Sequence, residues 1–286
     1  MMKALCAKLS EHLDRKIEYQ GEVPIGGGCI HQAVRLETSA GPFFVKQNDA
    51  SSLPQFAAEA KNLGQMAATK TILVPSPVLE TELEGRAFLV LSYIKFGPTP
   101  LDGGVRMGEK LADLHACGAE KFGWDEDNFI GSTPQVNGWC ESWPEFFARY
   151  RLGAMQKKLA DIGEEFTGLS ELIERVDSFF DDHQPEPSLL HGDLWGGNAG
   201  FGEDGEPVLF DPACYYGHDE ADLAFTEMFG GFSKEFYDAY HRQRPRRSGY
   251  PKRKELYNLY HLLNHTLLFG GAYGSQARRV IQVLLP

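Results

Sequence analysis

Three polar side chains at fixed spacing within residues 188–222 constrain this chain more than any other feature. The stretch SLLHGDLWGGNAGFGEDGEPVLFDPACYYGHDEAD contains Asp193, Asn198 and Asp211, with Asp193 and Asn198 five positions apart. In kinase-type phosphotransferases an Asp takes the proton of the acceptor hydroxyl, and an Asn five residues later holds Mg²⁺. A second Asp, after a hairpin, holds Mg²⁺ against the nucleotide phosphates. The spacing therefore predicts a phosphoryl-transfer centre.

The residues between these three have the local character that such a centre needs. Leu189 and Leu190 predict a short buried strand before HGD, and GEDGEP predicts a hairpin turn before the apolar run PVLF. Gly196 and Gly197 would let the loop turn tightly, so that Asn198 faces back toward the base. The alternative is that each polar residue is only a turn or cap former, because Asp and Asn are common in both positions.

Several segments together resemble one known family. LLHGDLWGGN, FDPA, YYGH, DLAFTEMFGGF and DNFIGSTPQ are similar to the fructosamine/ketosamine kinase family, which has a protein-kinase-like fold of the aminoglycoside-phosphotransferase type. The resemblance implies an α+β fold with two lobes. Residues 1–94 would form a nucleotide-binding lobe with an antiparallel sheet of about five strands plus a helix. Residues 95–286 would form a mainly helical catalytic and substrate-binding lobe.

The resemblance also implies the reaction. The expected activity is ATP-dependent, Mg²⁺-assisted phosphorylation of the sugar 3-hydroxyl of a ketoamine, a sugar joined to an amine by glycation, and hence protein deglycation. Asp193 would be the base, Asn198 and Asp211 would hold Mg²⁺, and Trp195 offers an aromatic face for the sugar or its amine. Free and protein-bound ketoamines both remain open as acceptors. Position 219 is Asp where relatives are expected to be less acidic, which leaves acceptor preference open.

The N-terminal part of the chain predicts a phosphate-binding strand system. Residues 17–48 read as strand, turn, strand, turn and strand. The first turn holds three glycines whose backbone N–H groups could approach nucleotide phosphates, although a plain hairpin is the default interpretation and GxGxxGxV is not matched. These glycines are Gly26, Gly27 and Gly28.

A lysine and a glutamate strengthen that interpretation. FFVK places Lys46 near the end of the third strand, where a kinase has its phosphate-pairing lysine. The helical pattern that follows carries Glu59, and an ion pair between the two would hold the ammonium toward the α- and β-phosphates. After two further strands, the connection between lobes would offer backbone groups to adenine at Ser92, Tyr93 and Ile94.

Other conspicuous residues have structural interpretations. His115 is expected to be a satisfied core histidine, and His261 and His265 are expected to pack rather than bind metal, because no acidic third ligand stands near them. Trp139 and Trp143 are interpreted as core anchors, with a sugar-side wall as the alternative. Asp222 is expected to brace the catalytic loop or cap a helix.

Composition narrows the setting. The net charge of −12 argues against a nucleic-acid binder, and no apolar run is long enough to span a membrane. Five scattered cysteines without metal-ligand spacing favour a reducing, cytoplasmic location. Cys29, beside the glycines, is a candidate redox residue, so the chain is expected to be a monomer or a redox-dependent dimer. The basic segment 241–254 is interpreted as a solvated loop, with an anionic partner as the alternative.

Two rival functions remain. One is another small-molecule kinase of the same fold, acting on an aminoglycoside, choline or homoserine, against which DNFIGSTPQ and LWGGN argue. The other is a nucleotide-binding scaffold without activity, which would be expected to lack one of the key polar residues. Protein-kinase activity ranks lower, because HGD and DPA stand where protein kinases have HRD and DFG.

Overall fold

The structure, a computed structural model, describes residues 1–26, 31–181 and 183–285. The chain divides into two compact units. The N-terminal unit comprises Met1–Pro100 and Phe201–Asp211, and the C-terminal unit comprises Leu101–Gly200 and Pro212–Pro286. The lobe boundary expected after residue 94 stays a prediction. What the division adds is that the segment ending at Asp211 packs with the N-terminal residues, although it lies far from them in sequence.

The N-terminal unit contains the predicted antiparallel sheet of five strands. The structure shows that their order is β1-β2-β3-β5-β4. Its strands are β1 (Tyr19–Ile25), β2 (Gln32–Thr38), β3 (Phe43–Asp49), β4 (Pro77–Leu83) and β5 (Arg86–Ser92). β3 lies in the middle and pairs with β2 on one side and β5 on the other, so a side chain on β3 has neighbours on both sides.

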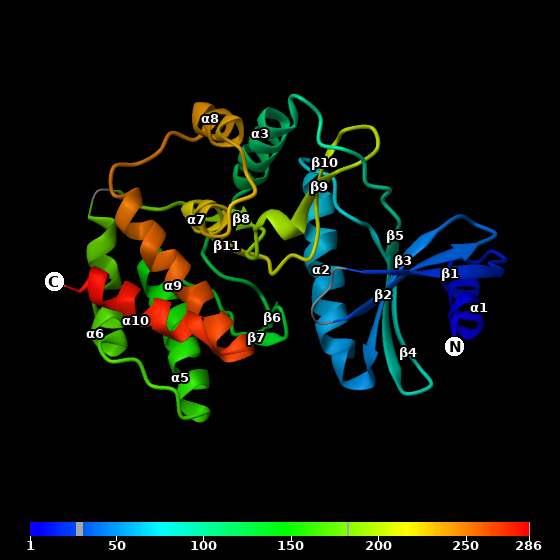
Figure 1. The fold of residues 1–286 in the computed structure, drawn as a ribbon, viewed down its shortest axis with the longest axis horizontal. Helices are drawn as coiled ribbons and strands as arrows, with labels where there is room; N and C mark the ends of the chain where they lie inside the picture. The colour runs from blue at the N-terminus through cyan, green and yellow to red at the C-terminus, as the bar shows by residue number, and fades with distance from the viewer. Residues whose placement is uncertain (27–30, 182, 286) are drawn as a thin grey trace. The chain divides into compact units, whose positions relative to one another are not determined.

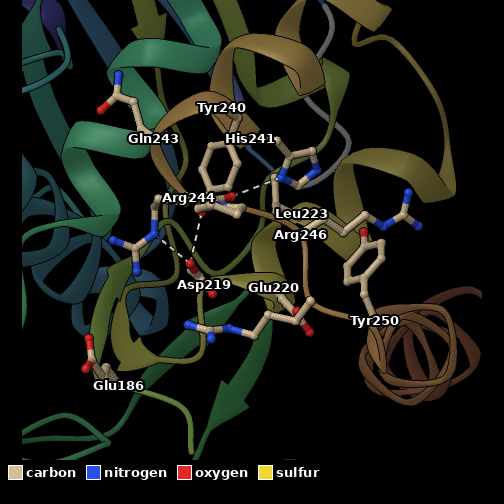
Figure 2. Close-up of a pocket in the computed structure, with 12 residues that line it drawn as sticks. Glu186, Asp219, Glu220, Leu223, Tyr240, His241, Gln243, Arg244, Arg246 and Tyr250 are labelled. Atoms are coloured by element: carbon tan, nitrogen blue, oxygen red, sulfur yellow. Dashed lines mark hydrogen bonds and ion pairs between the residues drawn. The ribbon is translucent and has the colours of Figure 1, made fainter. Parts of the chain in front are cut away.

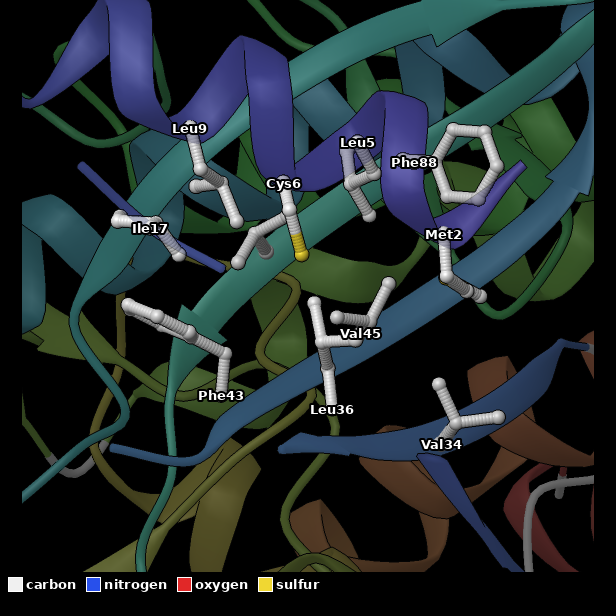
Figure 3. Packing of buried hydrophobic residues seen from close by; sticks show 11 residues of the cluster. Met2, Leu5, Cys6, Leu9, Ile17, Val34, Leu36, Phe43, Val45 and Phe88 are labelled. Atoms are coloured by element: carbon white, nitrogen blue, oxygen red, sulfur yellow. The ribbon is translucent and has the colours of Figure 1, made fainter. Parts of the chain in front are cut away.

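Two helices pack on the sheet of the N-terminal unit (Figure 1). Helix α1 (Met2–His12) buries Met2, Leu5, Cys6 and Leu9 against strand residues that include Leu36, Val45 and Phe88 (Figure 3). Side chains alternate along a strand, so the β3 residues next to Val45 point to the opposite face. Helix α2 (Leu53–Thr69), which follows a 3₁₀ turn at Ala50–Ser52, packs beside β4 and β5.

The C-terminal unit is mainly helical, as predicted. Its long helices are α3 (Gly103–His115), α7 (Glu220–Met228), α8 (Lys234–Gln243), α9 (Tyr250–Phe269) and α10 (Ala272–Leu284). α3 packs on α8, and α9 packs on both α7 and α10 (Figure 1). The α3–α8 contact requires Gly108, because a Cβ there would lie 2.3 Å from the carbonyl oxygen of Phe236.

The remaining elements are short. These are α4 (Trp143–Phe146), a π-helical turn (Phe147–Gly153), α5 (Ala154–Asp161), α6 (Leu169–Glu174), and 3₁₀ turns at Val176–Phe180 and Gly196–Asn198. The strands pair as β6 (Asn128–Ile130) with β7 (Thr133–Gln135), β8 (Ser188–Leu190) with β11 (Tyr215–Gly217), and β9 (Ala199–Phe201) with β10 (Pro207–Leu209). The strand predicted before HGD and the hairpin predicted at GEDGEP are both present.

Two expectations are wrong. The first is that Trp139 is a core anchor, because its side chain is 46% exposed and stacks on Tyr216 outside the core. Trp143, for which the same role was predicted, is a core anchor with 1% of its surface exposed. Residues 241–254 are not a solvated loop throughout, because α8 ends at Gln243 and α9 begins at Tyr250. Basic side chains of this segment pair with acids across the unit: Arg242 with Glu109, Arg244 with Asp219, Arg253 with Glu220 and Lys254 with Glu227.

Of the helices formed by the described residues, none combines the length and the hydropathy that a membrane crossing requires.

The α1 core provides a stability prediction. Leu5 is fully buried, so Leu5→Ala should lower the free energy of unfolding by about 2–5 kcal/mol through lost apolar burial and the cavity left behind. Urea denaturation followed by far-UV circular dichroism measures the change. Lys3→Ala, on the exposed side of the same helix, is the matched control. Equal midpoints for the two variants would show that α1 does not stabilise the sheet.

Candidate active site

Strand β3 and helix α2 bring a lysine and a glutamate together inside the N-terminal unit. Lys46 points away from the α1 core, and its Nζ lies 2.7 Å from Oε1 of Glu59 on α2. Asp211, at the end of the segment that rejoins this unit, accepts a second bond from Lys46 Nζ at 2.6 Å. The lysine side chain is 8% exposed and the glutamate 11%, whereas Asp211 is 47% exposed. The predicted Lys46–Glu59 ion pair is therefore present.

The cluster of Lys46, Glu59 and Asp211 contains two carboxylates and one ammonium. Burial alone would lower the pKa of Lys46, but the two carboxylates outweigh it and raise that pKa above its ordinary value, so the ammonium form is kept. Burial raises the pKa of Glu59. When all three groups are ionised, one ammonium and two carboxylates give the cluster a net negative charge. Asp211 also has a left-handed backbone (φ 58°), which is uncommon for a residue with a side chain.

In the C-terminal unit, the loop that follows β8 brings Asp193 and Asn198 into contact. Asn198 Nδ2 donates to the backbone oxygen of Asp193 at 2.9 Å and to its carboxylate Oδ2 at 3.2 Å. The 3₁₀ turn Gly196–Asn198 produces this approach, and within it the backbone N–H of Asn198 donates to the Trp195 carbonyl oxygen at 2.9 Å. The prediction that the loop turns Asn198 back toward Asp193 is confirmed.

Asp222, on the first turn of α7, holds the start of this loop. Its carboxylate accepts the backbone N–H of His191 at 2.7 Å and that of Gly192 at 2.9 Å. Gly192 has φ +80°, and a Cβ there would lie 2.1 Å from the Ala213 carbonyl oxygen, so this position requires glycine. Asp222 is 2% exposed, which means that it braces the loop and does not face solvent. The sequence-based expectation for Asp222 is confirmed.

Trp195 lies at the surface beside the loop. The indole is 40% exposed and meets Phe229 edge-to-face, with ring centroids 6.1 Å apart. Gly197 leaves room for the indole, because a Cβ at that position would lie 2.3 Å from two of the ring carbons. The role predicted for this exposed indole in binding a sugar stays a prediction.

Two groups of predicted residues remain untested. Gly27, Gly28 and Cys29 lie outside the described residues, so the phosphate-loop and redox expectations stay predictions; Gly26, at the edge of that stretch, has open space where a Cβ would stand. Ser92 ends β5, Tyr93 receives the Arg35 guanidinium over its ring at 5.6 Å, and Ile94 follows. A role in adenine binding stays a prediction for these three residues.

The residues predicted to hold Mg²⁺ have suitable chemistry. Asp211 accepts the Lys46 bond with Oδ1, and Asn198 donates to Asp193 with Nδ2. These bonds leave Oδ2 of Asp211 and Oδ1 of Asn198 as oxygens that could coordinate a metal ion. Carboxylate and amide oxygens are hard donors of the type that Mg²⁺ prefers. Each residue therefore fits a magnesium-binding role.

The DNFIGSTPQ motif forms a buried brace that sequence reasoning did not foresee. Asn128 Nδ2 donates to the Cys214 carbonyl at 2.8 Å, and Gln135 Nε2 donates to the Ala213 carbonyl at 3.2 Å. Tyr260 of α9 in turn donates to Gln135 Oε1 at 2.7 Å. The motif thus holds the backbone at the last residue of FDPA and at the residue that follows it. No local signal revealed this role, because the motif and its targets are about 80 residues apart.

Comparisons with known proteins agree with this geometry. A model of the fructosamine kinase family matches residues 1–286. The chain belongs to this family. It is 43% identical over 284 residues to a probable ketoamine kinase of Synechocystis, which covers 99% of this chain and 96% of the relative. It is also 43% identical over 263 residues to the chloroplastic protein-ribulosamine 3-kinase of Arabidopsis thaliana, covering 90% of this chain and 80% of the relative.

Solved structures give the same result for the fold of this fructosamine kinase family member. A Haemophilus somnus protein assigned as a fructosamine-3-kinase superposes with a TM-score of 0.92 at 30% identity, over 100% of this chain and 98% of the other. Aminoglycoside phosphotransferase APH(4)-Ia superposes with a TM-score of 0.65 at 13% identity, over 99% of each chain, which shows a shared fold. The predicted protein-kinase-like fold and the family-level prediction of a ketosamine-kinase-type phosphotransferase are confirmed. A cytoplasmic location stays a prediction.

The histidines interpreted as structural pack inside the C-terminal unit. His115 is 1% exposed with partners at both ring nitrogens, and His261 stacks on Phe225 with centroids 3.6 Å apart. Among the described residues, the one cluster with metal-ligand proximity is His183, His218 and Glu220. Its members already have protein partners: His218 bonds Tyr257 and His183, and Glu220 accepts two bonds from Arg253.

His218 generates a prediction about pH. Burial lowers its pKa from 6.5 to about 3, so between these values the unfolded state binds more protons than the folded state. Stability should therefore fall as pH decreases through this range, and the wild-type melting temperature should drop more between pH 7 and pH 5 than that of His218→Gln. His12→Gln, at an exposed position, is the control and should keep the wild-type slope. Parallel slopes for all three proteins would contradict the assignment.

Proposed function

We propose that this protein transfers the γ-phosphoryl group of ATP to the sugar 3-hydroxyl of a ketoamine. The observation that carries the proposal is the contact between Asp193 and Asn198 in a loop braced by Asp222, within a chain of the fructosamine kinase family. Relatives named ketoamine kinase and protein-ribulosamine 3-kinase support the acceptor class and the position of the hydroxyl.

The chemical roles follow from the charges of the residues. Asp193 would orient the acceptor hydroxyl and take its proton, with Asn198 limiting the carboxylate to one orientation. Lys46, kept cationic by Glu59, would neutralise the phosphate tail of ATP. Asn198 and Asp211 would each offer an oxygen to Mg²⁺, which would neutralise charge on the nucleotide phosphates. Positioning and charge account for most of catalysis in phosphoryl transfer, and these residues supply both.

The acceptor side is supported by exposed aromatic rings. Trp195 and Phe229 are 40% and 46% exposed and contact each other next to the loop that carries the base. A ketoamine combines a sugar ring with an amine that is protonated at neutral pH, and aromatic faces bind both groups. The net charge of −12 also favours a cationic acceptor over an anionic one. Protein deglycation in the cytoplasm is the corresponding physiological proposal, with free or protein-bound ketoamines as substrates.

The decisive test is ADP release across ketoamines, choline and aminoglycosides. Wild-type protein should turn over ketoamines selectively, and Asp193→Asn should lower kcat by about 10²–10⁴-fold because the general base is lost. ATP binding, measured by calorimetry, should be unchanged in the variant. ATP binding without turnover of any acceptor would instead identify a scaffold, and selective turnover of choline or an aminoglycoside would identify the other small-molecule kinase.

Trp195 provides a separate test of the acceptor side. Trp195→Ala should raise the KM for the ketoamine roughly tenfold, which corresponds to the loss of an aromatic contact of about 1.4 kcal/mol. The KM for ATP and the melting temperature should not change, because the indole is half-exposed. Phe269→Ala, at another exposed aromatic residue, is the control. A lower melting temperature with unchanged acceptor KM would mean that Trp195 serves only in packing.

A further inference from the structure

A cavity of about 300 Å³ in the C-terminal unit exposes one end of a buried hydrogen-bond chain (Figure 2). It is lined by residues from the first turn of α7, the end of α8 and the start of α9. At its wall, Arg244 Nε donates to Asp219 Oδ2 at 2.6 Å, and the Tyr240 hydroxyl donates to the same oxygen at 3.2 Å (Figure 2). Asp219 therefore receives two donors from the C-terminal half of α8 and the residue that follows it.

The chain continues inward from the Tyr240 hydroxyl. His115, the last residue of α3, has Nδ1 2.8 Å from that hydroxyl and Nε2 3.1 Å from Asp222 Oδ2. Asp222 Oδ2 is the same oxygen that accepts the His191 N–H. Tyr240, His115 and Asp222 are each no more than 2% exposed. The chain thus runs through the core from the cavity wall to the backbone immediately before Asp193.

The position of Asp222 depends on few partners. Two backbone N–H groups of the loop bond its two oxygens, and His115 approaches from the side of α3. In a buried setting, each lost partner leaves a polar group unsatisfied, so the carboxylate has a strong preference for the geometry that keeps all of them. If Asp222 were displaced, the backbone N–H groups of His191 and Gly192 would either move with its carboxylate or lose their bonds to it. The loop would change its conformation in both cases.

We propose that His115 and Tyr240 are positioning residues for the phosphoryl-transfer reaction. They set the orientation of Asp222 and through it the placement of Asp193, and Asp219 with Arg244 anchors the outer end of the chain. This inference rests on the proposed function for its kinetic consequence, whereas its structural consequence, the stability of the loop backbone bonds, can be measured without any acceptor.

A matched pair of tyrosine variants tests the outer link. Tyr240→Phe removes the hydroxyl that joins His115 to Asp219, while Tyr237→Phe, on the same helix, removes a hydroxyl that bonds only Thr226 among the described contacts. Amide hydrogen exchange of the peptide covering 188–194 should become about tenfold faster in Tyr240→Phe and stay at the wild-type rate in Tyr237→Phe. The kcat of Tyr240→Phe should fall about tenfold with the KM for ATP within twofold of wild type.

A second pair tests the inner link at His115. A glutamine amide nitrogen can replace Nε2 and keep the bond to Asp222, whereas an asparagine amide nitrogen reaches only the position of Nδ1. His115→Gln should therefore retain more kcat and slower loop exchange than His115→Asn. Tyr240→Phe, His115→Gln and His115→Asn could instead lower the melting temperature while loop exchange and kcat stay at their wild-type values. In that case the hydrogen-bond chain is only structural and the proposal is wrong.

The two proposals fail in different ways. Altered loop exchange in Tyr240→Phe and His115→Asn, in a protein that turns over no ketoamine, would keep the positioning role and reject the proposed function. Ketoamine turnover that is unaffected in every variant would keep the function and reject the positioning role.

Discussion

A buried ammonium determines how the N-terminal unit is arranged. Lys46 lies on the central strand of the sheet, and burying its charge is costly unless anionic partners accompany it. Glu59 on α2 and Asp211 at the end of a distant segment provide those partners, at 2.7 and 2.6 Å. The strand, the helix and the returning segment therefore share one electrostatic requirement. Asp211 is also half-exposed, which is compatible with the metal-binding role proposed for it.

In the C-terminal unit, side chains hold an irregular loop in one conformation. Backbone groups in a loop need partners, and here a carboxylate on a helix takes two of them while glycine at position 192 permits the close approach. The DNFIGSTPQ brace acts similarly on the last residue of FDPA and on the residue that follows it. Side chains from regular elements thus position the functional backbone on both sides of β8 and β11, which supports the interpretation that this unit carries the catalytic base.

The sequence correctly predicted contacts between residues that lie in one turn or on adjacent elements. The Asp193–Asn198 contact requires only a five-residue turn, and the β3 lysine with the α2 glutamate requires only adjacent elements. It failed for Trp139, because the burial of an aromatic residue depends on which elements surround it and not on its neighbours in sequence. It failed for residues 241–254 because the acids that neutralise them come from other helices, such as Glu220 on α7 and Glu109 on α3.

The sequence by itself determined the five-stranded sheet, the family and the identities of the polar residues, because strand alternation, turn chemistry and motif spacing act over a few positions. Only the tertiary structure decided that His115 meets Tyr240, 125 positions away, and that Asp219 is paired with Arg244. The physical reason is that a buried polar side chain must find a partner somewhere in the fold, and the packing of α3 on α8 selects that partner.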